Sequence, residues 1–202
     1  MKIVFIWLFL LSYAFASDAT IEVIKKVESL PTLAVEDSSI SYDDTFKLEF
    51  FKTLVSDLNV ISLFNVDRHY RETHFNDTNV ITDNKDMNYV LRYKMFEDDD
   101  GALNIETKLI SNSANVFIKN YKISSKNVYM FVAHAIAFDI NEFMGAPSVA
   151  WMKNKVIFSR VIDAKLSEIV LSDYTLNYQH VLVKGGFNVF PKWANKKQDA
   201  FY

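Results

Sequence analysis

The chain has 202 residues, and its 22 lysines and arginines against 25 acids give a net charge of −3. This balance argues against a nucleic-acid-binding protein, which would carry a basic surface. Cysteine is absent, which excludes disulfides, thiolate metal sites and cysteine nucleophiles. With 17 phenylalanines and 10 tyrosines, the chain has ample material for an ordinary hydrophobic core.

The first sixteen residues have the layout of a secretory signal peptide. Met1-Lys2 carries one positive side chain, residues 3–11 are apolar, and Ala14-Phe15-Ala16 offers a cleavage site after Ala16. The alternative is a membrane anchor, but the apolar run is shorter than the roughly 20 residues that a membrane span needs. We therefore expect an exported chain that is not inserted in a membrane.

The next part of the chain predicts three strands and a loop. Residues 20–28 begin with alternating apolar and polar side chains, and residues 33–37 form a second short run after a proline. Residues 60–66 are a further strand candidate. Residues 67–86 are polar and weakly patterned, which indicates a loop with a short helix.

Between these strands, Asp43-Asp44 opens a helix, because acidic residues suit its positive N-terminal end. Its predicted buried stripe follows the helical spacing. The stripe consists of Phe46, Phe50, Leu54, Val55 and Leu58.

A β-meander is predicted from residue 87 onward. Residues 87–96, 102–110 and 115–123 alternate in the manner of strands. Asp100-Gly101 in the first turn is a strong hairpin signal. Ser111-Asn112-Ser113 breaks the second and third strands apart.

A second helix is predicted from the Ser124-Ser125 cap to about Met144, and Gly145-Ala146-Pro147 ends it. One apolar stripe consists of Val128, Phe131, Ala135 and Phe138, and Val132, Ile136, Ile140 and Phe143 widen it. Because so many of its side chains are apolar, this helix is expected to pack against a sheet. Residues 17–148 therefore predict a small α/β domain with two long helices on a mixed sheet.

Beyond Pro147 the pattern becomes all-β without a helical period. Residues 155–162, 167–174 and 180–184 are three short strands at regular spacing. Pro191-Lys192-Trp193 then forms a corner, followed by a polar turn and a new strand at residues 199–202. A propeller blade passes to its next strand in this way, so residues 149–202 predict the first blade of an incomplete β-propeller.

No catalytic, cofactor or metal site is predicted. His69 and His74 lie five apart, which does not fit the i, i+4 spacing of a zinc helix, so both are expected to be solvated loop residues. His134 is expected to be a satisfied core histidine and His180 an exposed one. The acidic turn at residues 97–100 lacks the spacing of a calcium loop and is expected to be a solvated hairpin tip.

The order of these parts, together with three segments near the end, resembles the TolB family of the Tol–Pal system. The segments are residues 156–161 and 168–174, and Pro191-Lys192-Trp193 followed by Asp199-Ala200-Phe201-Tyr202. The family's turn after the Pro-x-Trp corner is Ser-Pro-Asp-Gly, where this chain has residues 194–197. The resemblance covers essentially the whole mature chain and is better from the second helix onward.

This resemblance implies a non-enzymatic periplasmic adaptor. In the family, the propeller binds Pal, a lipoprotein tied to peptidoglycan, and the N-terminal strand docks with TolA of the inner membrane. The system maintains outer-membrane integrity during cell division, and some colicins exploit it for import. By position, the TolA-docking strand here is Ser17, Asp18, Ala19, Thr20, Ile21, Glu22, Val23 and Ile24.

Three alternatives stay open at this point. Residues 20–27 can simply be the first strand of the domain. Propeller motifs of this kind also occur in prolyl-oligopeptidase-like peptidases, although the G-x-S-x-G motif of their hydrolase domain is missing here. The chain can also be a stand-alone envelope domain that keeps a TolA-docking strand but lacks Pal binding.

Overall fold

The computed structural model describes residues 29–40, 42–77 and 87–202. The expected signal peptide, the strand at residues 20–28 and residues 78–86 lie outside the described residues. The elements, in which η denotes a 3₁₀ helix, are β1 (Thr32–Asp37), α2 (Asp44–Val60), β2 (Asn65–Val66), β3 (Tyr89–Glu97), β4 (Leu103–Ser111), β5 (Ala114–Ile123), η1 (Lys126–Val128), α3 (Tyr129–Phe143), η2 (Ala150–Lys153), β6 (Val156–Asp163), β7 (Leu166–Ser172) and β8 (Gln179–Val183).

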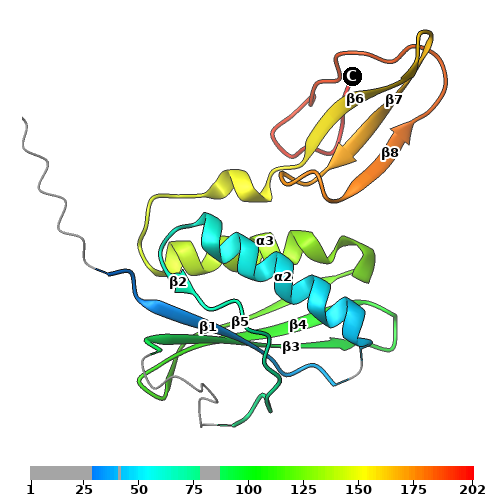
Figure 1. The fold of residues 1–202 in the computed structure, drawn as a ribbon. Coiled ribbons are helices and arrows are strands. Elements are labelled where there is room, and N and C mark those ends of the chain that lie inside the picture. Colours follow the sequence, from blue (N-terminus) through cyan, green and yellow to red (C-terminus); the bar gives the residue numbers. More distant parts are fainter. Residues whose placement is uncertain (1–28, 41, 78–86) are drawn as a thin grey trace, which may run out of the picture.

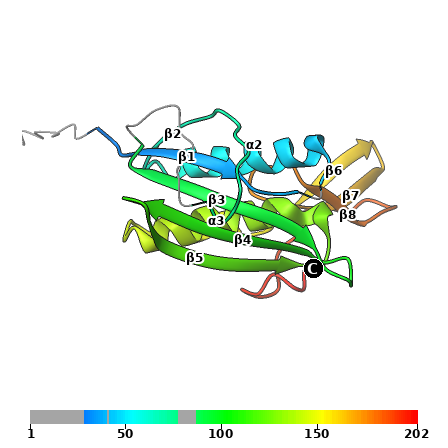
Figure 2. The same cartoon turned by 90° about the horizontal axis from the view of Figure 1, so that it is seen from below.

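The first eight elements form a two-layer unit with a mixed sheet. The five strands lie in the order β2-β1-β3-β4-β5. Strand β1 is parallel to both β2 and β3, whereas β3, β4 and β5 form the predicted antiparallel meander. Helices α2 and α3 lie side by side over one face of this sheet (Figure 1), and the opposite face is seen from below in Figure 2. The main core lies between helices and sheet.

Helix α2 confirms the predicted start and stripe. Asp43 is the N-cap, because its side chain accepts a hydrogen bond from the backbone N–H of Phe46 at 3.0 Å. The predicted stripe residues are all buried. The Phe50 ring packs against the Tyr93 ring of β3 with a centroid distance of 4.9 Å, so the helix is anchored on the sheet by aromatic contacts.

In helix α3 the two predicted apolar stripes are buried to different degrees. Phe131, Ala135 and Phe138 of the first stripe are only partly buried. Val132, Ile136 and Ile140, with the neighbouring alanines 133 and 137, face the core and are almost fully buried. The helix is apolar on both sides because its second side also has a partner: the Phe131 ring lies 5.4 Å from that of Tyr178, beyond β7.

The strand predicted at residues 60–66 is mostly wrong. Val60 ends α2, Ser62 adopts a left-handed φ of 56°, and only Asn65–Val66 pairs with β1. Ile61 and Phe64 are buried in the core at this corner, so their apolar character reflects packing and not a strand. The short helix expected after this point is absent from residues 67–77, which run as a loop.

A buried ion pair fixes that loop to the outer face of the sheet. Arg92 of β3 and Glu36 of β1 have fully buried side chains, and two guanidinium nitrogens donate to Glu36 Oε2 at 2.9 and 2.7 Å. Nη1 of Arg92 also donates to the backbone carbonyls of His74 and Asp77, at 3.1 and 2.5 Å. One side chain therefore joins β3, β1 and the loop.

Strands β6, β7 and β8 form a separate three-stranded antiparallel sheet, as the sequence predicts. Two expectations for this region are corrected. The short 3₁₀ helix η2 precedes the sheet, although no helix was expected beyond Pro147. The new strand expected at residues 199–202 is reduced to one antiparallel bridge between Trp193 and Phe201. The fold is thus mixed α/β plus a small antiparallel sheet, and the incomplete propeller stays a prediction.

Candidate functional site

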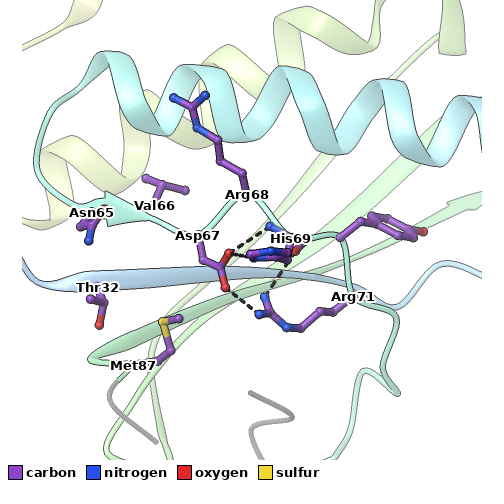
Figure 3. Close-up of a pocket in the computed structure, with 9 residues that line it drawn as sticks. Thr32, Asn65, Val66, Asp67, Arg68, His69, Arg71 and Met87 are labelled. Carbon is purple, nitrogen blue, oxygen red and sulfur yellow. Dashed lines mark hydrogen bonds and ion pairs between the residues drawn. The ribbon is translucent and has the colours of Figure 1, made fainter. Parts of the chain in front are cut away.

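A cavity of about 700 Å³ opens at the β2 edge of the five-stranded sheet (Figure 3). Its walls come from the start of β1, from β2 and the loop after it, and from Met87, two residues before β3 begins. The lining residues are Thr32, Asn65, Val66, Asp67, Arg68, His69, Tyr70, Arg71 and Met87. The cavity therefore lies where the described chain enters its first strand.

Asp67 organises the wall of this cavity. Its carboxylate accepts hydrogen bonds from the backbone N–H of His69 at 3.0 Å and from Nη2 of Arg71 at 2.6 Å, and the His69 ring nitrogen Nδ1 lies 2.5 Å away. Burial opposes ionisation of this carboxyl, but the bonds from His69 and Arg71 outweigh burial and lower the pKa of Asp67. Asp67 is thus a charged anchor for the loop.

Arg68 connects this cavity to a second one. In Figure 3 its side chain points away from Asp67 toward helix α2. There it borders a cavity of about 390 Å³ with Lys52, Ser56, Asn59 and three apolar residues of α2, namely Phe51, Val55 and Val60. The rim of this cavity therefore carries two cations, Arg68 and Lys52, beside apolar side chains of α2.

The two loop histidines are exposed, as the sequence predicts, and neighbouring residues attach the loop to the rest of the unit. His69 and His74 are exposed. The Tyr70 hydroxyl donates to Asp37 Oδ2 at 3.0 Å and to Glu72 Oε1 at 2.9 Å, and Lys47 of α2 pairs with Glu72 at 3.0 Å. The loop is therefore pinned to α2 and β1, which the sequence did not reveal.

The remaining sequence candidates have structural roles. His180 is exposed on β8. In the turn at residues 97–100, Asp98 accepts hydrogen bonds from its own hairpin and pairs with Lys122 at 2.6 Å. The Trp193 indole N–H donates to the carbonyl of Lys155 at 3.1 Å. Within the described ranges, no group of three His, Cys, Asp or Glu side chains is placed to hold a metal ion.

His134 is confirmed as a buried, hydrogen-bonded histidine. The sequence did not predict its two hydrogen-bond partners. They are Asp57 of α2 and Asp173, which directly follows β7. Asp57 is an acidic residue among the apolar residues of α2, and this unusual position was the only sequence signal that it has a buried partner. The predicted docking strand, Ser17 to Ile24, lies outside the described residues.

The described residues thus form a mixed α/β unit and a small antiparallel sheet, and Arg68 borders both cavities of the α/β unit. No protein-family model matches the chain. The chain is 40% identical to the Tol-Pal system protein TolB of Wolinella succinogenes over 99% of its length and 48% of that protein. It is 33% identical to TolB of Campylobacter jejuni, over all of the chain and 46% of that protein.

The chain is a TolB homologue, and it spans about half the length of the curated relatives it matches. This homology supports the expectation of a non-enzymatic protein, because these relatives are components of the Tol-Pal system. Among solved structures, TolB from Acinetobacter baumannii covers 78% of this chain and 39% of its own, with a TM-score of 0.49 and 11% identity. None of the helices in the described ranges is long and apolar enough to cross a membrane.

Proposed function

We propose that this protein is a periplasmic adaptor of the Tol–Pal system. In this role it connects peptidoglycan-bound Pal with inner-membrane TolA, maintains outer-membrane integrity during cell division, and is open to use by colicins. The single observation that carries the proposal is the 40% identity to a Tol-Pal system protein across 99% of the chain. The signal peptide predicted at residues 1–16 is consistent with the periplasm.

The TolA contact is assigned to the eight residues from Ser17 to Ile24. Only residues 25–31 separate them from β1, so Ile24, the end of the segment nearer β1, lies at most roughly 25–30 Å from Thr32, which lines the cavity at the β2 edge. An extended segment can add to the edge of a partner's sheet, where its backbone supplies hydrogen bonds and alternate side chains supply specificity. Ile21 and Val23 point the same way in such a strand.

Pal binding is assigned to a propeller of which residues 149–202 form the first blade. The three-stranded antiparallel sheet β6-β7-β8 supports this assignment, since blades are built from antiparallel sheets. Residues 17–148 are then the N-terminal α/β domain. We assign no Pal-contact residue within the chain.

The TolA assignment is tested by titration calorimetry of the mature chain, expected to begin at Ser17, with the soluble part of TolA. Removal of residues 17–24 should abolish binding. Ile21→Ser with Val23→Ser should weaken binding at least about tenfold, because two apolar anchors are lost. The matched control is Thr20→Ser with Glu22→Ser on the other side of the strand. Equal binding by the truncated chain would refute the assignment.

A stand-alone envelope domain is the second candidate, and Pal distinguishes it from the first. The same calorimetry is done with soluble Pal. Binding of TolA without binding of Pal by the natural, full-length product favours the stand-alone domain. Binding of both supports the complete adaptor.

A further inference from the structure

Three buried side chains join the helices to the three-stranded sheet. His134 of α3 places Nδ1 2.7 Å from Asp57 Oδ2 of α2, and Nε2 3.1 Å from Asp173 Oδ2. The side chains are 0% exposed for His134 and Asp173 and 1% for Asp57. Asp57 and His134 belong to the α/β unit, whereas Asp173 begins the turn between β7 and β8.

The same turn surrounds the histidine with further contacts. The Tyr174 hydroxyl donates to Asp57 Oδ1 at 2.5 Å, and its ring lies 4.6 Å from the His134 ring. Asp173 accepts hydrogen bonds from the backbone N–H groups of Thr175 at 3.0 Å and Tyr178 at 2.8 Å, and from the Thr175 hydroxyl. Asp173 thereby holds its own turn in shape and presents a carboxylate oxygen to the α/β unit.

Counting protons shows what this arrangement requires. A neutral imidazole has one N–H and one lone pair, whereas an imidazolium donates from both nitrogens. Both ring nitrogens of His134 face carboxyl oxygens, so with both aspartates ionised two hydrogen bonds form only when the ring is charged. Loss of the proton would turn one of these contacts into a lone pair facing a buried carboxylate, which is costly.

The other titratable groups near His134 are themselves engaged in hydrogen bonds or ion pairs. Burial opposes ionisation of Asp173, but the hydrogen bonds from Thr175, Tyr178 and His134 lower its pKa. Burial and Asp57 raise the pKa of Tyr174, so that hydroxyl keeps its proton. Farther along α3, Asp139 is occupied by Lys119 at 2.7 Å and by the Tyr121 hydroxyl at 2.7 Å.

We propose that Asp57, His134 and Asp173 form a proton-dependent clasp, which holds the β7–β8 turn against α2 and α3 when the imidazole is protonated and releases it when the imidazole is neutral. In the closed state the imidazole keeps its proton. In the open state the ring loses that proton once the pH rises above the pKa of a free imidazole, so above this pH the closed state carries one proton more. By linkage, closure is favoured by falling pH and lost as pH rises, by up to about tenfold per pH unit. The proposal is independent of TolA or Pal binding.

Hydrogen–deuterium exchange of the full chain tests the clasp. Amides of residues 173–178 are followed between about pH 5.5 and about pH 8.5, a range that spans ordinary histidine titration, with rates corrected for intrinsic exchange. Opening of this turn should increase with pH, while amides of β4 in the same sample should show no such increase. A turn that opens equally at all pH values would overturn the proposal.

Two variants separate the clasp from ordinary packing. Asp57→Asn leaves one carboxylate at the ring. A neutral imidazole can then donate Nε2–H to Asp173 while the new amide donates to Nδ1 and its oxygen still accepts from Tyr174, so the turn should stay closed at high pH. His180→Gln changes an exposed histidine and should keep the wild-type profile. Retention of the wild-type pH dependence by Asp57→Asn would contradict the proposal.

His134→Gln should open the turn at every pH, because no cation then separates the two carboxylates. If that variant does not fold, ¹⁵N spectroscopy of the wild-type His134 ring takes its place. Both ring nitrogens should be protonated at low pH, and loss of one proton should coincide with opening of the turn. A ring that is neutral while the turn is closed would overturn the proposal.

Discussion

Single polar side chains tie distant parts of this chain together. Arg92 joins two strands and a loop, and His134 joins two helices and a turn. Asp98 does the same on a smaller scale, since it binds its own hairpin and reaches Lys122 on β5. Each of these links makes a separate prediction at the scale of one residue.

Asp98 should titrate far below an ordinary aspartate. Hydrogen bonding to Lys122, then to the Ala102 backbone, lowers its pKa to about 2 from 3.8. Because the folded-state pKa is depressed, the stabilisation is complete above the ordinary value and is lost as pH falls through about 2. A ¹³C titration of the carboxyl should show this midpoint, and Lys122→Gln should move it upward. An unshifted midpoint in the wild type would disprove the pairing.

Arg92→Met should destabilise the fold by about 3–5 kcal/mol, because it leaves the Glu36 carboxylate buried without its cation. Burial already raises the pKa of Glu36 despite the arginine. The double change with Glu36→Gln should recover only part of this loss, since the carbonyls of residues 74 and 77 still lack their donor. Urea denaturation measures each variant, and full recovery in the double variant would show that the carbonyl contacts contribute nothing.

At the scale of elements, the helix starts and the meander follow from local signals. The Asp43 cap, the alternation along β3 and the two left-handed turn residues Asn112 and Ser113 are all written in neighbouring residues. The errors have another origin. The false strand at residues 60–66 arose, and the unequal burial of the two α3 stripes went unpredicted, because apolar residues there pack against partners distant in sequence, which no local pattern identifies.

Asp43→Ala should lower the free energy of unfolding by about 0.5–2 kcal/mol, because the N–H of Phe46 loses its acceptor. Asp43→Asn keeps an acceptor oxygen and serves as the control, with an expected loss well below that of alanine. Thermal and urea unfolding of the three proteins provide the comparison. An alanine variant as stable as wild type would mean that the cap does not contribute.

At the scale of the whole molecule, exposed apolar side chains gather on the three-stranded sheet and the tail after it. They include Val161, Ile162, Phe187, Phe190 and Tyr202, all more than half exposed. Apolar surface of this kind favours association with another surface. In the proposed blade, the neighbouring blade would cover it.

The mature form of this 202-residue chain should therefore self-associate at high concentration. Val161→Lys with Phe187→Lys should reduce the association. Both side chains are more than half exposed, so the changes place charge on the apolar surface without opening the core. Ile40→Lys, which changes an 85% exposed residue of the α/β unit, is the matched control. Sedimentation velocity over a range of concentrations measures the effect. A wild-type chain that remains monomeric throughout would contradict this prediction.

The sequence by itself determined the class of fold, the two helices, the meander and the likeness to TolB, because caps, turns and periodicity act between near neighbours. It also indicated that His134 is a satisfied core residue. Only the tertiary structure decided which residues hydrogen-bond to His134, which face of α3 meets the sheet, and where the two cavities beside Arg68 lie. These features depend on contacts between residues up to 117 positions apart, as between Asp57 and Tyr174, and such contacts leave no local pattern.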